Sequence, residues 1–485
     1  MSASWDMEAD VIVIGYGGAG AVAALTACDK GASVIILEKN PEGGGNTRVS
    51  GGGFLIPSDI RFAEYIETIC AGLTEMGIIL TFVKGAMKIA EWIHSIGGDL
   101  QVFQPLRVSH LGPSTGASFP WLSGSEFFTK YKVKEPADEV DGERLWKFLA
   151  NVVGKRPISV LTNTPAEELI INNTGEVVGV KALKESHNII YIKAKKAVIL
   201  ASGGFAYDEA IKREFLPCRP LFAFGDPGNT GDGIRMAQKA GAGLWHMSAA
   251  SAALGFKTAE YEAAFKLSFL TERFIFINRD ARRFINETGL DDHEIVNHIS
   301  LFDTTLFRFP HIPAYAIFDE IGREKAPLYE AHSGSNRYVY SWSPDNSKEI
   351  ERGWIVKAQT ISELARKISV NEFDLENNIS NYNKYCQTGE DLDFKRSSET
   401  LSPIDTPPFY AVELYPCLTN TQGGPRRDSS ARILDSYGNP IPRLFSAGEL
   451  GSIWGFLYQG SGNISECFVF GEIAGRIAAQ QAKWD

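Results

Sequence analysis

Cysteine is scarce in this chain, and its spacing carries no motif. The 485 residues hold six cysteines, which are Cys28, Cys70, Cys218, Cys386, Cys417 and Cys467. No CxxC or CxxCH pattern occurs among them, so the sequence predicts no zinc site, iron–sulfur cluster, c-type haem or redox dithiol. We therefore expect no bound metal, and thiols that are buried or neutral.

Long apolar runs and an excess of positive charge are also lacking. No stretch approaches the roughly 18 apolar residues of a membrane-spanning helix. The acidic Asp6 and Glu8 stand where a signal peptide would be basic and then apolar. The formal net charge of −11 argues against a nucleic-acid or anionic-membrane partner. These absences predict a cytoplasmic protein without a transmembrane segment.

What is present begins with a glycine-rich motif between two apolar runs. Residues 9–38 have the pattern of a strand, a turn that starts at Gly15, an alanine-rich helix and a second strand that ends on Glu38. This order is typical of a dinucleotide-binding βαβ unit. Gly15 permits the tight turn, Gly17 lets the backbone approach a pyrophosphate, and Gly20 allows close packing of helix on strand. Glu38 is placed to bind a ribose hydroxyl.

A second glycine-rich loop indicates which dinucleotide is bound. Residues 43–53 contain six glycines, and such a loop can surround a large planar ligand in a way that a nicotinamide site does not need. The loop resembles the second FAD-contact loop of the fumarate reductase and succinate dehydrogenase flavoprotein superfamily. The resemblance implies FAD. We expect it to be non-covalent, because no histidine or cysteine lies in the flavin-contact motifs apart from Cys467 beyond the last loop.

Later segments extend the resemblance over nearly the whole chain. By it, the β-meander of residues 159–204 places Ala166 near the adenine, and residues 229–233 open a helix against the cofactor. The last helix begins at residues 461–463, and its N–H groups would point at the flavin C2 carbonyl. The residues expected to bind FAD are Gly15, Gly17, Gly18, Ala19, Gly20, Glu38, Lys39, Gly45, Asn46, Thr47, Ser50, Gly51, Gly52, Ala166, Ser202, Gly203, Thr230, Gly231, Asp232, Gly448, Glu449, Gly462, Asn463 and Ile464.

The predicted fold is α/β, a Rossmann-like FAD-binding domain with an inserted α+β capping, or catalytic, domain. Glycine loops stop after residue 251, and the composition becomes more charged and aromatic. Within this region, residues 283–287 match the superfamily signature R-F-x-N-E. The expected division is residues 1–251 for the first part of the FAD-binding domain, 252–412 for the capping domain and 413–485 for the last part.

The substrate is less clear, because three expected cations are missing. Fumarate reductases of this superfamily carry a histidine and two arginines at positions that match Asn420, Gln459 and Asp291 here. Without those cations a dicarboxylate has no obvious partner for its charge. Fumarate and succinate are therefore disfavoured as substrates.

The last glycine loop resembles that of 3-ketosteroid Δ1-dehydrogenases in its Tyr458-x-x-x-Gly462 pattern. The resemblance implies that the Tyr458 hydroxyl and the Gly462 N–H hold a ketone oxygen and stabilise an enolate as the α-proton leaves. A tyrosine that only packs beside the flavin is the alternative. Asp291 is our candidate base, although Asp291-Asp292-His293-Glu294 also has the pattern of a helix N-cap. Tyr338 and Tyr340 are fallback bases.

The predicted function is an FAD-dependent dehydrogenase that desaturates the α,β-bond of a cyclic ketone or 3-ketosteroid. Two alternatives remain open. One is an ene-reductase of the fumarate reductase type that runs the reaction backwards, and the other is a flavoprotein oxidase or hydroxylase. The chain has no second GxGxxG unit after a strand, so we expect an external electron acceptor or donor.

Overall fold

The computed structural model describes residues 5–103, 116–139, 141–184, 188–289, 291, 293–329 and 333–484. The predicted βαβ unit lies at the centre of a sheet. β1 (Met7–Ile14) leads through Gly15, whose φ is +101°, into α1 (Gly18–Asp29), and β2 (Val34–Leu37) follows. β1 pairs in parallel with β2 on one side and with β9 (Asn188–Leu200) on the other. The β-branched side chains of β1 are buried, as expected for a parallel strand covered on both faces.

The sheet around this unit has eight strands. Its order is β19-β20-β9-β1-β2-β6, and β7 and β8 form an antiparallel meander attached to β9. The four strands β1, β2, β9 and β6 pair in parallel, and so do β9 and β20. The further bounds are β6 (Ile158–Leu161), β7 (Ala166–Ile171), β8 (Val177–Lys184), β19 (Arg432–Leu434) and β20 (Pro440–Ser446).

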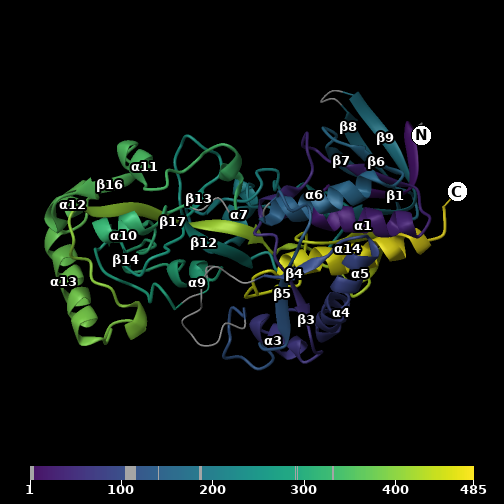
Figure 1. Cartoon of the computed structure of the whole chain (residues 1–485). Coiled ribbons are helices and arrows are strands. Elements are labelled where there is room, and N and C mark those ends of the chain that lie inside the picture. Colours follow the sequence, from purple (N-terminus) through teal and green to yellow (C-terminus); the bar gives the residue numbers. More distant parts are fainter. Residues whose placement is uncertain are drawn as a thin grey trace.

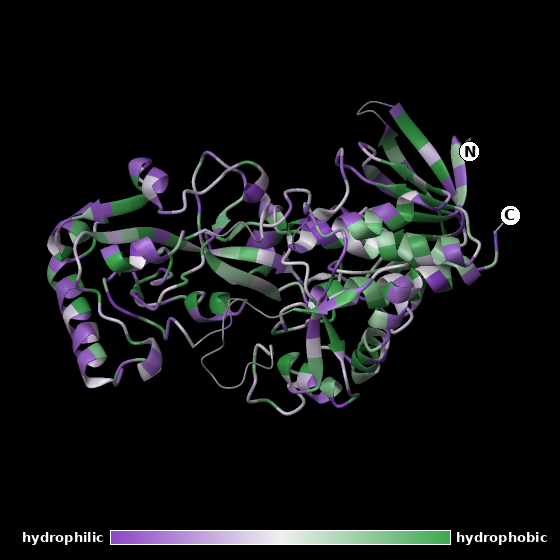
Figure 2. Cartoon of the chain, viewed as in Figure 1, coloured by the Kyte–Doolittle hydropathy of each residue, from purple (hydrophilic) through white to green (hydrophobic). Residues whose placement is uncertain are grey.

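α14 (Gly462–Gln480), the predicted last helix, packs along α1 on one face of this sheet (Figure 1). The approach is close because glycines face the partner backbone. A Cβ on Gly475 would lie 2.3 Å from the Ala23 carbonyl oxygen, and one on Gly471 would lie 2.9 Å from that of Ala19. Hydrophobic residues are frequent along both helices (Figure 2), and residues of both belong to the core cluster beneath the N-terminal motif.

The middle of the chain forms a second sheet of seven strands at the other end of the molecule (Figure 1). Its order is β13-β12-β17-β15-β14, with β10 and β16 also paired to β17. The strands are β10 (Phe222–Ala223), β12 (Ala250–Phe256), β13 (Phe265–Lys266), β14 (Phe274–Ile277), β15 (Ala314–Asp319), β16 (Ile355–Ala358) and β17 (Phe409–Thr421). Helices α9 (Ile295–Ile299), α10 (Glu320–Lys325), α11 (Ser347–Glu351), α12 (Ile361–Lys367) and α13 (Glu372–Thr388) belong to the same region.

A third, smaller unit is inserted in sequence between β2 and β6 of the first sheet, and it packs against α14. The pattern of residues 62–98 predicts helices, and α3, α4 and α5 confirm it. They accompany a three-stranded sheet of order β3-β5-β4. The bounds are β3 (Phe54–Pro57), α3 (Phe62–Ile69), α4 (Met76–Ala86), α5 (Ile89–Ser95), β4 (Leu100–Val102) and β5 (Phe128–Val133).

The remaining elements of the described residues are α2 (Gly45–Val49), α6 (Asp141–Gly154), α7 (Glu209–Phe215), α8 (Asp232–Lys239), β11 (Leu244–Trp245), β18 (Gly424–Pro425) and the 3-10 turns Ser335–Tyr338 and Ser398–Thr400. Two of them begin at predicted glycine loops, since α2 starts at Gly45 and α8 at Asp232. Among the residues described, no helix is both long and apolar enough to cross a bilayer.

Candidate active site

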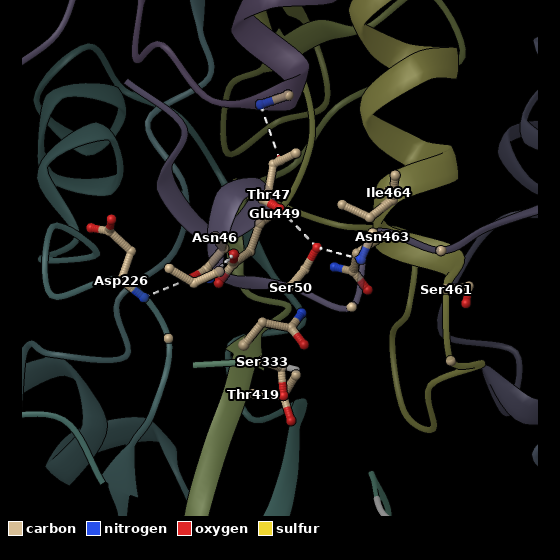
Figure 3. A pocket seen from close by; sticks show the side chains of 18 of the residues that line it. Asn46, Thr47, Ser50, Asp226, Ser333, Thr419, Glu449, Ser461, Asn463 and Ile464 are labelled. Carbon is tan, nitrogen blue, oxygen red and sulfur yellow. Dashed lines mark hydrogen bonds between the residues drawn. The ribbon is translucent and has the colours of Figure 1, made fainter. Parts of the chain in front are cut away.

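Most of the predicted motifs line one cavity with a volume of about 1340 Å³. The N-terminal motif, the second glycine loop and the first turn of α14 border it, and Figure 3 shows Asn46, Thr47, Asn463 and Ile464 around the same space. The predicted FAD-binding residues that line it are Gly15, Gly17, Gly18, Ala19, Glu38, Lys39, Gly45, Asn46, Thr47, Ser50, Gly51, Gly52, Ala166, Ser202, Gly203, Asp232, Glu449, Asn463 and Ile464. Segments far apart in sequence therefore meet at one site.

The remaining five predicted FAD-binding residues, Gly20, Thr230, Gly231, Gly448 and Gly462, do not line the cavity. Three of them are glycines at which neighbouring groups leave no room for a side chain. An added Cβ on Gly20 would lie 2.0 Å from the Gly15 oxygen, one on Gly448 would lie 2.7 Å from Ala19 Cβ, and one on Gly462 would lie 2.1 Å from the Trp454 ring. Gly231 takes a φ of +73° at the start of α8.

Thr230 contacts two residues that line the cavity. Its hydroxyl accepts a 2.5 Å hydrogen bond from Lys39 Nζ, which also pairs with Asp232 at 2.7 Å. The five residues thus shape the elements around the cavity.

Four helices begin at the cavity without a side-chain cap. The residues before α1, α2, α8 and α14 are Gly17, Gly44, Gly231 and Ser461, and none of their side chains accepts a helix N–H. A helix N-terminus presents free N–H groups and a partial positive charge, which suits phosphate and carbonyl oxygens. The first N–H groups of α1 and α14 are bound within the protein, at Gly18 by Thr47 Oγ1 and at Gly462 by the Gln459 carbonyl. The positive ends of the four helices still suit the pyrophosphate and flavin oxygens of FAD.

Polar atoms without partners give a second test of that fit. The side-chain oxygens of Ser202, Thr419 and Asn463 are buried, line the cavity and have no hydrogen-bond partner among the residues described. Buried polar groups in proteins are nearly always hydrogen-bonded. Their positions are therefore those expected of groups that bind a polar ligand, and FAD is such a ligand.

Glu449, from the last glycine loop, is fixed at the cavity wall. Its carboxylate accepts hydrogen bonds from Asn46 Nδ2 at 2.8 Å and from the Thr421 N–H at 3.1 Å. Burial raises the pKa of Glu449 to about 7, and these hydrogen bonds oppose the shift. The contacts tie the second and last glycine loops together.

A buried ion pair supports the loop that precedes α14. Arg427 and Glu466 are both fully buried and bind each other directly. Glu466 also accepts hydrogen bonds from Ser452 Oγ at 2.7 Å and from the Ile453 N–H at 3.0 Å. Removing one partner of such a pair leaves an unpaired buried charge, so this pair holds the loop against the helix.

Tyr458 lies at the cavity wall in this loop. Its hydroxyl accepts a hydrogen bond from the Asn463 N–H at 3.3 Å, and the phenol's own proton remains available to a ligand. Burial raises the pKa of Tyr458 well above its ordinary value. The residue is therefore a neutral hydrogen-bond donor. Its predicted partner is not presented in the same way, because the Gly462 N–H donates to the Gln459 carbonyl at 2.9 Å.

Asp291 and His293 form a hydrogen-bonded pair beside Tyr458. Asp291 Oδ1 accepts from the His293 N–H at 2.9 Å and from His293 Nδ1 at 2.7 Å. The His293 ring meets the Tyr458 ring edge-on at 5.3 Å between centroids. Both members of the pair line the cavity.

Asp291 is not the N-cap of a helix in the structure. α9 begins at Ile295, Glu294 precedes it, and the Asp291 carboxylate binds His293 rather than a helix N–H. Burial alone would raise the pKa of Asp291, but the His293 charge and hydrogen bonds outweigh it and hold that pKa well below the ordinary value. Asp292 lies outside the described residues.

Other sequence candidates lie away from the cavity lining. Tyr338 is about half exposed and its hydroxyl contacts Glu143 and Arg337. The Tyr340 hydroxyl donates to Glu349 at 2.6 Å. Tyr338 is thus held against α6, and Tyr340 is held within the second sheet unit.

The three positions that lack cations have different surroundings. Asn420 lines the cavity. Gln459 is buried and accepts hydrogen bonds from the Tyr65 hydroxyl at 2.5 Å and the Ser118 N–H at 2.9 Å. Gln459 therefore joins the last loop to the chain around Ser118. Asp291 binds His293.

The motif arginine Arg283 is also buried, where it pairs with Glu287 at 2.9 Å and with Asp391 at 3.0 Å. Its guanidinium therefore anchors the R-F-x-N-E segment, and of these three residues only Glu287 lines the cavity.

Sequence reasoning missed two cavity residues with chemistry to offer. His293 was noted only as a neighbour of Asp291, and the Asp-x-His spacing was the available signal. Lys130, on β5, also lines the cavity. Alternating Lys130, Lys132 and Lys134 on a predicted aromatic stretch was a weak signal, because such lysines are usually solvent-exposed.

Residues 10–464 match the family model of the FAD binding domain, so the chain belongs to that family and is an FAD-dependent oxidoreductase. It is 28% identical to urocanate reductase of Eggerthella lenta, over 98% of this chain and 75% of that protein. It is 26% identical to 4-oxocyclohexanecarboxylate 2-dehydrogenase of Sinomonas cyclohexanicum, over 98% and 94% of the two chains. The chain spans about half the length of two further curated relatives.

The fold is also that of a solved steroid enzyme. The structure of 3-ketosteroid Δ1-dehydrogenase from Sterolibacterium denitrificans in complex with 1,4-androstadiene-3,17-dione superposes with a TM-score of 0.84. The identity is 23%, and the match covers 97% of this chain and 99% of that one. At this identity the likeness establishes the fold.

The purified protein is expected to release its FAD on acid precipitation. Cys467 is the cysteine that lines the cavity in the described part of the chain, and burial raises the pKa of its thiol to about 12. A protonated thiol is a poor nucleophile, so no covalent flavin link is expected. Yellow colour in the supernatant after acid denaturation checks this. Colour retained by the precipitate would contradict it.

Proposed function

We propose that this chain transfers hydrogen at a Cα–Cβ bond next to a carbonyl, the predicted α,β-desaturation of a cyclic ketone or its reversal as an ene-reductase. The single observation that carries the proposal is the placement of Tyr458 beside the Asp291–His293 pair at one cavity. An oxygen-binding donor next to an oriented base is what enolisation requires. The reductase and dehydrogenase names of the two curated relatives support the same reaction class.

Tyr458 acts on the carbonyl oxygen. Its phenol donates one hydrogen bond, which stabilises negative charge on that oxygen as the α-proton leaves. The neighbouring Asn463 N–H binds the phenol oxygen and keeps the hydroxyl in place. This differs from the expected donor pair of Tyr458 and Gly462, because the Gly462 N–H is bound to the Gln459 carbonyl.

His293 acts on the α-proton. The Asp291 carboxylate accepts a hydrogen bond from Nδ1–H, so whenever the ring is neutral its lone pair lies on Nε2. Nε2 has no hydrogen-bond partner among the described residues. We therefore assign the base to His293 and a positioning role to Asp291. FAD, when bound, would supply the two-electron acceptor for hydride from the β carbon, which would leave the double bond between the α and β carbons.

The second sheet unit is proposed as the capping domain, with the predicted boundaries at residues 252 and 412. Residues 268–272 and 287–289 of this unit line the same cavity as the flavin motifs, which supports that role. The sheet itself extends past both boundaries, since β12 starts at Ala250 and β17 ends at Thr421. An external carrier is proposed to take or supply the electrons.

Anaerobic mixing tests the proposed function. Oxidised protein mixed with 4-oxocyclohexanecarboxylate or a 3-ketosteroid should lose its flavin absorbance and yield the conjugated enone. Protein reduced beforehand should be reoxidised by that enone without oxygen. If only oxygen reoxidises the flavin and the product gains an oxygen atom, the protein is a hydroxylase and the proposal fails.

A further inference from the structure

Lys130 brings a cation to the end of the cavity where Tyr458 and His293 lie. Its stem passes Gly116, where an added Cβ would lie 3.5 Å from Lys130 Cδ. Its Nζ reaches the last glycine loop, because a Cβ on Gly460 would lie 3.7 Å from Lys130 Nζ and 3.2 Å from His293 Cε1. The ammonium and the imidazole therefore border the same point of the loop.

Among the residues that the structure describes, no contact neutralises the charge of Lys130. No carboxylate in the described part of the chain lies within 4.0 Å of its Nζ, and no hydrogen bond to it is formed there. The next two lysines of the segment differ, because Lys132 pairs with Asp141 at 2.5 Å and Lys134 with Asp99 at 2.6 Å. Within the described ranges, Lys130 thus differs from Lys132 and Lys134 in having no paired carboxylate.

The acidic residues near Lys130 do not neutralise its positive charge. Burial lowers the pKa of Lys130, and the charge of Asp291 opposes that shift from a distance, but Asp291 Oδ1 is bound to His293. Glu294 lies behind Tyr458, whose N–H it accepts at 3.0 Å, and burial raises the pKa of Glu294 to about 8. At neutral pH it is therefore largely uncharged. The hydroxyls of Tyr65 and Tyr458 are neutral, since burial raises the pKa of both.

We propose that Lys130 binds a carboxylate of the substrate, which makes the substrate class a keto acid or its unsaturated counterpart rather than a neutral ketone. A partly buried ammonium without a counter-charge is costly, and an anionic ligand group removes that cost. The three cations that the sequence lacks at motif positions are thereby replaced by one from β5. This inference rests on the proposed function for the reacting ketone.

The first measurement compares two ligands on the unmodified holoenzyme. 4-Oxocyclohexanecarboxylate and its methyl ester share one ring and one ketone, and they differ in charge. Calorimetric titration of photoreduced holoenzyme measures binding alone, because reduced flavin cannot oxidise a saturated ketone. The acid should bind about tenfold or more tightly than the ester. Equal binding would overturn the inference.

The second measurement assigns the preference to Lys130. Lys130→Met should weaken binding of the acid by about 10- to 100-fold, the range for a hydrogen bond to a charged group, and leave the ester unchanged. Lys130→Arg should retain the preference for the acid. Lys134→Met is the matched control, since it removes the same charge from an exposed, paired lysine of the same segment. It should change neither ligand.

The outcomes separate the anion site from the reaction. If Lys130→Met weakens both ligands equally, or changes only the flavin spectrum, Lys130 contacts the flavin or the ketone and the inference is overturned. A Lys130-dependent preference for the acid without flavin reduction would support the anion site and reject the proposed function. Equally fast reduction by acid and ester with equal affinities would reject only the anion site.

Discussion

Tyr458→Phe is expected to keep its FAD and to reduce it roughly 10²-fold more slowly than the unmodified protein with a ketone substrate. Loss of one donor to a developing oxyanion has about this effect. The ring contacts of Tyr458 with Trp454, at 5.6 Å, and with His293 are preserved by phenylalanine. Packing is therefore largely unchanged, and the deficit should appear in the chemical step.

Single-turnover reduction of the bound flavin measures that deficit. Flavin content and melting temperature serve as controls, because a variant that loses FAD would be slow for another reason. A rate equal to that of the unmodified protein would return Tyr458 to the alternative role of packing beside the flavin.

His293→Gln is expected to slow α-proton abstraction by about 10²- to 10⁴-fold, the usual contribution of a positioned base. Exchange of the ketone's α-hydrogens with solvent deuterium reports that step directly. Glutamine retains a polar side chain at the cavity but cannot act as a base near neutral pH. The expected stability change is small, since His293 is only partly buried.

Asp291 provides the companion test. Asp291→Asn should slow the same exchange by less than His293→Gln does, since the base remains and only the charged acceptor of its Nδ1–H hydrogen bond is replaced by a neutral amide oxygen. Asp291→Glu should recover part of the rate, which a purely structural role does not require. If His293→Gln exchanges normally while Glu294→Gln does not, the base is Glu294, the buried carboxyl behind Tyr458.

Much of the cofactor site could be predicted because the requirements are local. Gly15 needs a positive φ, and Gly20 must lack a side chain because a Cβ there would overlap the Gly15 oxygen. Such constraints fix residue type and spacing within one βαβ unit. The start of α14 behind Ser461 followed from the same kind of local pattern.

The sequence by itself therefore determined the nucleotide-binding fold, the cofactor and the loop that carries Tyr458. Only the tertiary structure decided the chemistry at the substrate end. Lys130, His293 and Tyr458 come from three segments, and each of these residues is more than 150 positions from the next in sequence. No periodicity predicts which side chains of such distant segments face one cavity. The same packing binds the Gly462 N–H to the Gln459 carbonyl and turns Asp291 toward His293. Local pattern specifies backbone conformation, whereas the pairing of distant polar groups depends on how the units pack.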